Sequence, residues 1–393
     1  MTTLITAAQL LTDNGLIADP ILVLENTVIT TLTTRAASDL PQATIHHHYP
    51  GATLAPAFLD VHTHGCCGRD VMEATPDALD TVNRFLAQHG VGAYLPTTIT
   101  APHDVTLRSL AGLAKLLARP AKPGQAHPLG IHLEGPFLSH AKRGAHPTRD
   151  LLEPSIPFFE AMWQAAEGRI TLMTLAPELP GAIDLIAHAV ARGVQVSIGH
   201  SDGSAEDAQA AITAGAVSAT HTFNAMRRLD HREPGILGAV LTTDTLYAEL
   251  ICDGLHTDPS MVQLFARAKP SHRAILITDA MSAAGMPDGT YKLGELDVRV
   301  TAGRAITGEN TLAGSTLTLD TAIRNYRQFA QISLAEALHA ATRNPARMAR
   351  LDATVGILAE GRPANLNVLS PSGQILATYL AGVPVERSPL ANS

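Results

Sequence analysis

The stretch Pro56-Ala-Phe-Leu-Asp-Val-His-Thr-His-Gly65 is the one from which the fold can be inferred. Its apolar part has the length of a buried β-strand, and two histidines spaced two residues apart close it. Residues two apart on an extended strand point to the same side. His62 and His64 are therefore expected to face one point and chelate a metal ion. The alternative is one inward histidine whose neighbour is only a structural partner.

Apolar runs of strand length recur through the middle of the chain and alternate with helical patterns. This alternation is typical of parallel strands joined by crossover helices. The strands are expected to end near Asp60, Thr97, Glu134, Ala176, Gly199, Thr220, Cys252 and Thr278. Helices are expected over 77–89, 104–118, 182–192, 204–214, 259–268, 319–329 and 334–348. The pattern predicts an α/β chain built on a (β/α)8 barrel of the TIM type, whose interior branched aliphatic side chains would fill.

Both ends of the chain show short strand-like runs separated by turns, for example 364–369 and 375–380 around Pro371-Ser-Gly373. Two β-rich ends around a long middle suggest one small domain built from both termini. The predicted domains are a small β-sandwich from residues 1–53 and 354–393, and a barrel of residues 54–353 with a β-hairpin over its mouth near 287–308.

Composition narrows the class of protein further. The formal net charge of −8 argues against nucleic acid or an anionic membrane as a partner, although it leaves room for a local basic pocket. Three cysteines make no disulfide framework and suit a reducing compartment. Because no signal peptide and no apolar run of about 20 residues is present, a soluble cytoplasmic protein is expected.

The predicted strand ends carry histidines and acids in unusual number. They are His62 and His64, His132 and Glu134, His200 and Asp202, His221, Asp253 and His256, and Asp279. Each alone is more often structural, but the βα loops of a barrel converge on one mouth, so together they predict a metal site. Asp279 is the candidate acid/base, because a carboxylate beside a metal can pass a proton from water to a leaving amine. It could also be a ligand, and the two roles are compatible.

Several motifs follow one another in order between about residues 56 and 346. They are the opening stretch, Gly130-Ile-His-Leu-Glu-Gly-Pro-Phe137, Gly199-His-Ser201, His221-Thr-Phe-Asn-Ala-Met226, Arg232-Glu-Pro-Gly235, Asp253-Gly-Leu-His256, Thr278-Asp-Ala-Met281, Leu312-Ala-Gly-Ser315 and Asn344-Pro-Ala346. Together they resemble the N-acetylglucosamine-6-phosphate deacetylase family, a branch of the amidohydrolase superfamily. The histidine pair alone marks only the superfamily.

The resemblance implies hydrolysis of N-acetylglucosamine 6-phosphate to glucosamine 6-phosphate and acetate. It implies a divalent metal, zinc or iron, with one or two ions per subunit. Glu134, His200 and His221 match the main ligands, and His62 with His64 matches a second position that some members keep. Asp279 matches the catalytic acid/base.

The resemblance also implies a set of substrate contacts. They are Ala145, His146, Asn224, Ala225, Arg232, His256, Leu312, Ala313 and Gly314. Asn224, Ala225 and Arg232 match phosphate-binding positions, His146 lies near the sugar and acyl group, and 312–314 line the acyl end. The family is usually dimeric, with part of the phosphate pocket supplied by the neighbouring subunit.

Three alternatives remain open at this point. The substrate could be the galactosamine isomer, which the sequence does not separate from the glucosamine one. The chain could be another amidohydrolase, although the strand at 172–178 lacks the lysine that bridges two metals in many of them, so Glu134 would bridge instead. The barrel could also be a non-catalytic binding module, but no expected ligand or acid is missing.

Overall fold

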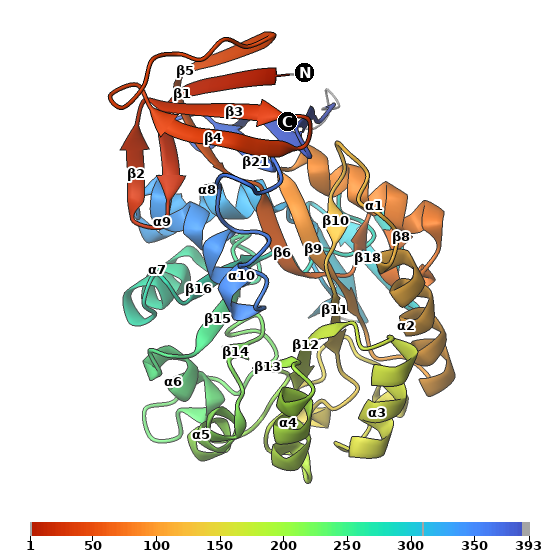
Figure 1. Ribbon diagram of the computed structural model, residues 1–393. Helices are drawn as coiled ribbons and strands as arrows, with labels where there is room; N and C mark the ends of the chain where they lie inside the picture. The colour runs from red at the N-terminus through yellow and green to blue at the C-terminus, as the bar shows by residue number, and fades with distance from the viewer. Residues whose placement is uncertain (1, 309, 387–393) are drawn as a thin grey trace.

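Figure 1 shows the computed structural model of the protein, which describes residues 2–308 and 310–386. A barrel of parallel strands lies beneath a strand-rich module that contains segments from both chain ends. Residues 387–393 of the predicted terminal domain lie outside the described residues. Among the described residues, no helix has both the length and the apolar character needed to cross a bilayer.

The barrel consists of parallel strands, as the sequence predicts. They are β6 (Phe58–Thr63), β9 (Val91–Thr98), β11 (Ile131–Glu134), β12 (Ile170–Leu175), β13 (Gln195–Ile198), β14 (Ser218–Ala219), β15 (Tyr247–Ile251) and β16 (Ala274–Ile277), with the short β10 (His127–Pro128) beside β9. From β9 onward they pair in chain order, and β6 pairs with β9. A parallel bridge between Thr63 and Ala280 links the far ends, so the barrel is nearly closed.

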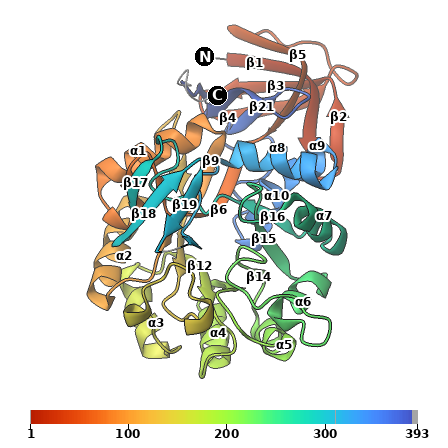
Figure 2. The ribbon, with the colours of Figure 1, turned by 180° about the vertical axis from the view of Figure 1, so that it is seen from behind.

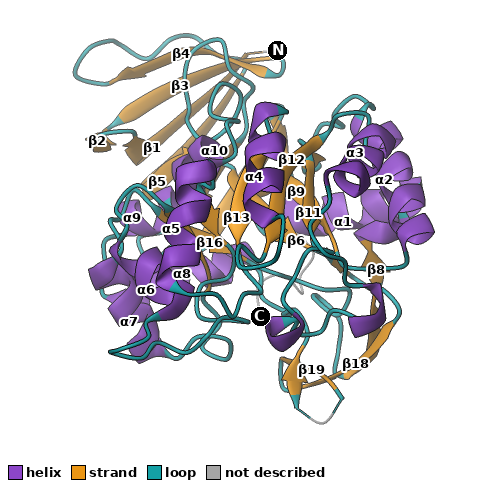
Figure 3. Cartoon of the chain, turned by 90° about the horizontal axis from the view of Figure 1, so that it is seen from below, coloured by secondary structure: helices purple, strands orange, loops and turns teal. Residues whose placement is uncertain are grey.

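Helices surround these strands on the outside (Figure 3). They are α1 (Pro76–Gln88), α2 (His103–Leu117), α3 (Ile156–Ala165), α4 (Ala182–Ala191), α5 (Ala205–Ala214), α6 (Gly235–Thr242), α7 (Pro259–Ala268), α8 (Leu319–Ala330), α9 (Leu334–His339) and α10 (Arg343–Met348), with 3-10 turns η1 (Val71–Glu73), η2 (His140–Lys142) and η3 (Thr148–Asp150). Sequence-coded caps set their ends: Ser204 and Asp207 form a capping box on α5, and Gly215 ends it with φ 112°.

The prediction of one helix over 334–348 is wrong, because the chain forms α9 and α10 with a break at Thr342, whose φ and ψ are −130° and −87°. In a continuous helix Pro345 could not donate a backbone hydrogen bond, because proline has no N–H, and its ring would clash with the preceding turn. The break places Pro345 in the first turn of α10, where amides have no partner within the helix. The helices α3 and α6 were not predicted, since one opens on Ile156-Pro-Phe-Phe and the other contains Gly235 and Gly238.

The chain ends form one eight-stranded sheet above the barrel. Its strands are β1 (Thr2–Thr12), β2 (Gly15–Ala18), β3 (Pro20–Glu25), β4 (Val28–Thr34), β5 (Ile45–Pro56), β21 (Leu366–Leu369), β22 (Ile375–Leu380) and β23 (Val383–Pro384). β21 from the C-terminal part pairs antiparallel with β5, which runs on toward β6. Buried residues from both ends, such as Ile5, Leu54 and Tyr379, make a core of their own. The limits at residues 53 and 354 remain predictions.

The predicted hairpin at 287–308 is part of a larger element. Four antiparallel strands form a sheet there: β17 (Gly289–Leu293), β18 (Leu296–Thr301), β19 (Arg304–Thr307) and β20 (Thr311–Leu312). Figure 2 shows β17, β18 and β19 beside the barrel. β20 is only two residues long and shows no alternation, which explains why the sequence pattern ended too early. The turns fall at Gly294 and Gly303, as expected. A separate small hairpin joins β7 (Gly65–Cys66) and β8 (Arg69–Asp70) after the first barrel strand.

Candidate active site

Side chains at the carboxyl ends of the barrel strands form two clusters that could each hold a metal ion. Cluster A consists of Glu134, His200 and His221, and cluster B of His62, His64 and Asp279. Within each cluster the donor atoms lie within 4.8 Å of one another, and all six side chains are buried. The fold thus brings together all six residues that the sequence singled out as ligands or acid/base.

The backbone turns sharply where several of these residues leave their strands. His200, His221 and Asp279 have φ values of 49°, 30° and 49°, in the left-handed region. For residues with a side chain, this conformation costs on the order of 1–3 kcal/mol and persists only where surrounding contacts impose it. At Asp279, the amide donates to the carbonyl of His62 at 2.9 Å, and the carbonyl accepts from the amide of Ser315 at 2.7 Å. Such strain is frequent at functional sites.

The Glu134 carboxylate connects the two clusters. Its Oε1 lies 3.1 Å from Nε2 of His200 and 3.2 Å from Nε2 of His221. Its Oε2 lies 3.3 Å from Nε2 of His64. The neighbouring strand β12 presents Thr174 at this depth, bonded to Thr220 at 2.7 Å. Glu134 therefore lies between the two clusters and contacts both.

The imidazoles of both clusters turn one nitrogen away from the centre. Nδ1 of His64 lies 3.0 Å from the carbonyl of Thr97, and Nδ1 of His200 lies 2.9 Å from the carbonyl of Lys142. A carbonyl only accepts, so each Nδ1 carries the hydrogen and each Nε2 offers a lone pair to the centre. Buried imidazole and carboxylate donors oriented in this way fit a divalent metal ion.

The charges of the buried carboxylates shift the neighbouring pKa values. Burial alone would lower the pKa of His64, but hydrogen bonds with Asp279 and Glu134 raise it to about 9. Burial would raise the pKa of Asp279, but the charge of His62 and the hydrogen bond with His64 outweigh it and hold this pKa below its usual range. The centre therefore keeps its carboxylates ionised and attracts positive charge.

A cavity of about 290 Å³ opens onto the two clusters. Its lining includes Glu134, His200, His221, His64 and Asp279, together with the predicted substrate contacts Ala145, His146, Asn224, Ala225, His256, Leu312 and Gly314. Leu293, Asn310 and Thr311, in and beside the sheet of β17–β20, also line it. The volume is close to the lower end for small-molecule sites, about 300 Å³.

Two predicted contacts are not among the residues lining this cavity. Ala313 is 1% exposed and packs with Met281 and Leu293 beneath the mouth. Arg232 lies in an exposed loop, where its backbone amide donates to Asp230 at 2.9 Å. Among the other strand-end residues, His132 is bonded through its ring to Thr174 at 2.8 Å, and Asp202 pairs with Arg227 at 3.4 Å. Both lie outside the two clusters.

His146 has a defined orientation at the cavity wall. Its Nδ1 accepts from the backbone amide of Thr100 at 3.2 Å, so in the neutral ring the hydrogen is on Nε2. That Nε2 lies 3.5 Å from Oε2 of Glu134. Burial lowers the pKa of His146 to about 4, which keeps the ring neutral near pH 7. His146 thus presents an N–H donor beside the clusters.

Sequence analysis missed the buried carboxylate of Glu249 in β15, whose Oε2 lies 3.4 Å from Nδ1 of His62. The available signal was an acid inside the apolar strand Tyr247-Ala-Glu-Leu-Ile251. Asp60 precedes His62 on the same face, but it accepts from the amide of His62 at 3.2 Å and from the hydroxyl of Thr278 at 2.6 Å, not from the ring.

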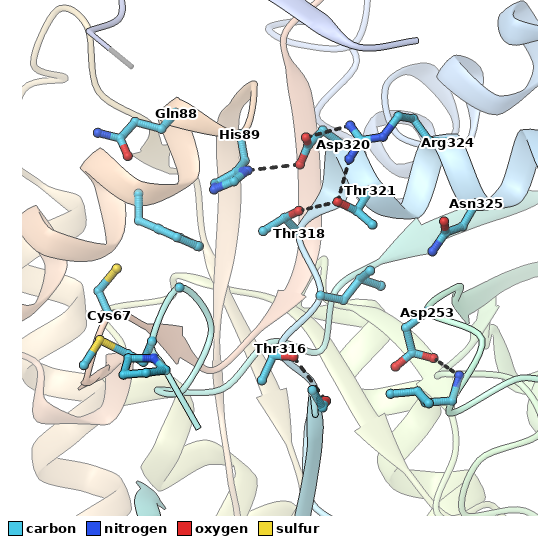
Figure 4. Close-up of a pocket in the computed structure, with 17 residues that line it drawn as sticks. Cys67, Gln88, His89, Asp253, Thr316, Thr318, Asp320, Thr321, Arg324 and Asn325 are labelled. Atoms are coloured by element: carbon cyan, nitrogen blue, oxygen red, sulfur yellow. Dashed lines mark hydrogen bonds and ion pairs between the residues drawn. The ribbon is translucent and has the colours of Figure 1, made fainter. Parts of the chain in front are cut away.

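A larger cavity of about 840 Å³ lies elsewhere, between α1, α8 and the loops after β15 and β16 (Figure 4). Three of its polar groups pair with one another: Asp320 contacts His89 at 3.1 Å and Arg324 at 2.9 Å. None of the residues of clusters A and B lines it. We therefore assign the chemistry to the smaller cavity, because reactive groups rather than size define an active site.

The barrel and the two clusters at its mouth define a class of protein, the (β/α)8 hydrolases with sites for divalent metal ions. The chain belongs to the amidohydrolase family, whose sequence pattern matches residues 53–385 and whose members generally use a divalent metal ion.

Individual relatives cover most or all of the chain. An N-acetylgalactosamine-6-phosphate deacetylase of Escherichia coli O157:H7 is 37% identical over 382 residues, which are 97% of this chain and 99% of that protein. An N-acetylglucosamine-6-phosphate deacetylase of Vibrio furnissii is 38% identical over 329 residues, 84% of this chain and 82% of that one. The resemblance to the deacetylase branch is thereby confirmed.

A solved structure agrees over the whole chain. It is an aspartate-to-alanine mutant of N-acetyl-D-glucosamine-6-phosphate deacetylase from Mycobacterium smegmatis in complex with N-acetyl-D-glucosamine-6-phosphate. It has a TM-score of 0.91 at 34% identity and covers 98% of this chain and 100% of that one. The barrel with its strand-rich module is therefore an established architecture of these relatives.

Proposed function

We propose that the protein hydrolyses the acetamide of N-acetylglucosamine 6-phosphate to glucosamine 6-phosphate and acetate, in amino-sugar catabolism and recycling. The observation that carries this proposal is a buried aspartate, Asp279, at the junction of two histidine–carboxylate clusters that open into one sugar-sized cavity. The names of the relatives supply the substrate class. Because a sugar phosphate is charged and does not cross a bilayer unaided, we place the reaction in the cytoplasm.

The galactosamine isomer is the second candidate substrate. The Escherichia coli O157:H7 relative that carries this name matches 97% of the chain, whereas the Vibrio furnissii relative named for the glucosamine isomer matches 84%. The two substrates differ only in the orientation of one ring hydroxyl. Their discrimination depends on a few hydrogen bonds in the cavity, so both belong in any assay.

Cluster A would hold one ion through Glu134, His200 and His221, and cluster B a second through His62 and His64. When bound there, a divalent metal ion supplies Lewis acidity, polarising a carbonyl and lowering the pKa of water toward about 7. Zinc and iron suit the mixture of imidazole and carboxylate donors.

Asp279 acts as the proton carrier of the reaction. Its carboxylate takes a proton from the water that forms the new C–O bond and delivers it to the nitrogen as the C–N bond breaks. His146 donates from Nε2 to the acyl oxygen, which gains negative charge as the carbonyl becomes tetrahedral. Leu312 and Gly314 line the cavity and would enclose the acetyl methyl group, with Ala313 packed behind them.

The phosphate would bind in the same cavity, near Asn224, Ala225 and His256. The side-chain amide nitrogen of Asn224 is buried without a hydrogen-bond partner among the described residues, and so is free to donate to an anion. Burial would lower the pKa of His256, but the hydrogen bond with Asp253 at 2.7 Å raises it, which favours a cation. Arg232 is exposed on a loop, and we propose that it completes the phosphate site of a neighbouring copy in a homodimer.

The decisive test is amine release from N-acetylglucosamine 6-phosphate, its galacto isomer and unphosphorylated N-acetylglucosamine. Both phosphorylated sugars are expected to be hydrolysed, the gluco isomer faster than the galacto isomer. The unphosphorylated sugar is expected to have a kcat/KM at least ten-fold lower, because the binding energy of the phosphate positions the sugar. Arg232→Ala is expected to raise KM for the phosphorylated substrates and leave the free sugar unchanged. No amine release from any of the three would refute the proposal, and equal rates with and without phosphate would refute the phosphate site.

His146→Gln is expected to lower kcat by roughly 10²–10³-fold, the usual effect of removing one donor to a developing oxyanion. Metal content should stay that of the wild type, because His146 belongs to neither cluster. KM should change little, since the interaction strengthens as the carbonyl becomes tetrahedral. Steady-state kinetics beside elemental analysis measure these quantities, and a variant that loses its metal instead would make His146 a ligand.

A further inference from the structure

Glu249 is a buried carboxylate for which the reaction described above has no use. It lies in the middle of β15, is 0% exposed, and forms an ion pair with His62 alone among the described residues. Its Oε2 lies 3.4 Å from Nδ1 of His62, and its Oε1 has no hydrogen-bond partner within the described part of the chain. A buried carboxylate with one acceptor atom unsatisfied is costly to retain.

The contacts of His62 explain where the balancing charge would come from. Its Nδ1 faces Glu249, while its Nε2 lies 3.5 Å from Glu134 and 3.5 Å from Asp279. One imidazole therefore sits among three buried carboxylates and can supply at most one positive charge. With His62 protonated, one divalent ion would balance the three carboxylates. With His62 neutral, as a metal ligand must be, one ion would leave one negative charge in excess, whereas two ions would exceed the carboxylates by one positive charge and leave room for an anionic ligand.

We propose that Glu249 is the positioning residue of cluster B and that it controls how tightly a second ion binds there. It accepts the hydrogen of Nδ1, so that Nε2 of His62 presents its lone pair to the centre. His64 and His200 have neutral backbone carbonyls at the same position, 3.0 Å and 2.9 Å away, so the carboxylate is particular to His62. The inference rests on the metal assignment of the proposed function and specifies the residue that controls the second ion.

The test is Glu249→Gln, which keeps the shape and an acceptor atom but removes the charge. Protein loaded with zinc and passed through gel filtration is analysed for bound metal and titrated with a chelator. The wild type is expected to retain two equivalents. The variant is expected to keep the first ion and to hold the second roughly 10–100-fold more weakly.

Asp320→Asn is the matched control. Asp320 is also a buried carboxylate that contacts Nδ1 of a histidine, His89, at 3.1 Å, but it lies in the larger cavity (Figure 4). It should retain two equivalents of zinc with the chelator resistance of the wild type. A loss of zinc from Asp320→Asn equal to that from Glu249→Gln would overturn the assignment, because the effect would then follow from any buried histidine–carboxylate pair.

A double-mutant cycle separates positioning from a general structural role. His62→Gln should lose the second ion, and adding Glu249→Gln to it should cause no further loss, because Glu249 acts through His62. Additive losses, an unchanged second ion in Glu249→Gln, or one ion in the wild type would each overturn the inference. None of these metal-binding measurements uses a sugar substrate. They therefore test the role of Glu249 even if the proposed substrate is wrong.

Discussion

Asp279→Asn is expected to lower kcat/KM by roughly 10³-fold, within the range observed when a positioned acid/base is lost. The amide has the size of the carboxylate but cannot take a proton from water or give one to the leaving nitrogen. Asp279 Oδ1 lies 3.1 Å from Nε2 of His64, so the cavity keeps its shape with Asn in this place. Amine release measured under saturating metal gives the effect on the proton transfers themselves.

Elemental analysis of the same preparation separates loss of the acid/base from loss of metal. The ion of cluster A should remain, since its ligands Glu134, His200 and His221 are untouched. Asp320→Asn, in the larger cavity that no residue of clusters A and B lines, should keep wild-type activity. If Asp279→Asn released amine as fast as the wild type, the proton carrier would have to be another residue.

Glu134→Gln is expected to abolish metal binding at cluster A and to lower the rate of amine release by roughly 10³-fold or more. The lost Lewis acidity stabilises the transition state by several kcal/mol, and each 1.4 kcal/mol is about ten-fold in rate. Glu134 approaches both clusters, with Oε1 3.1 Å from His200 and Oε2 3.3 Å from His64, so the second ion should weaken as well. Metal content and amine release, measured across added zinc concentrations, test this.

Glu160→Gln is the matched control for this substitution. Glu160 also accepts from a histidine, His188, at 2.6 Å, but on the helical exterior of the barrel. It should bind metal and turn over substrate like the wild type. Full metal content and activity in Glu134→Gln would show that this carboxylate is dispensable and that cluster A is not the primary metal site.

Much of the barrel was predictable because each strand carries its own local signal. The predicted end at Asp60 falls three residues short of the observed Thr63, and the other seven ends fall within one residue of those observed. The ligands follow from this, because parallel strands in a closed barrel deliver their carboxyl ends to one mouth. That His62 and His64 point to the same centre could be predicted from the two-residue period of a strand alone. Elements with weak local signals, such as α3 and β20, were not predicted.

The barrel, the strand-rich module built from the chain ends and the six residues of clusters A and B could be inferred from the amino-acid sequence alone. Hydrophobic periodicity and the strand-end position of these residues are local properties, and the topology fixes the rest. The three-dimensional fold was needed to show that Glu249 faces His62, 187 positions away in the chain, and that the amide of Thr100 orients His146. It also decided that Arg232 stands on the surface, outside the cavity of its own chain. Such pairings depend on barrel closure and on loop paths set by distant contacts, which no local pattern encodes.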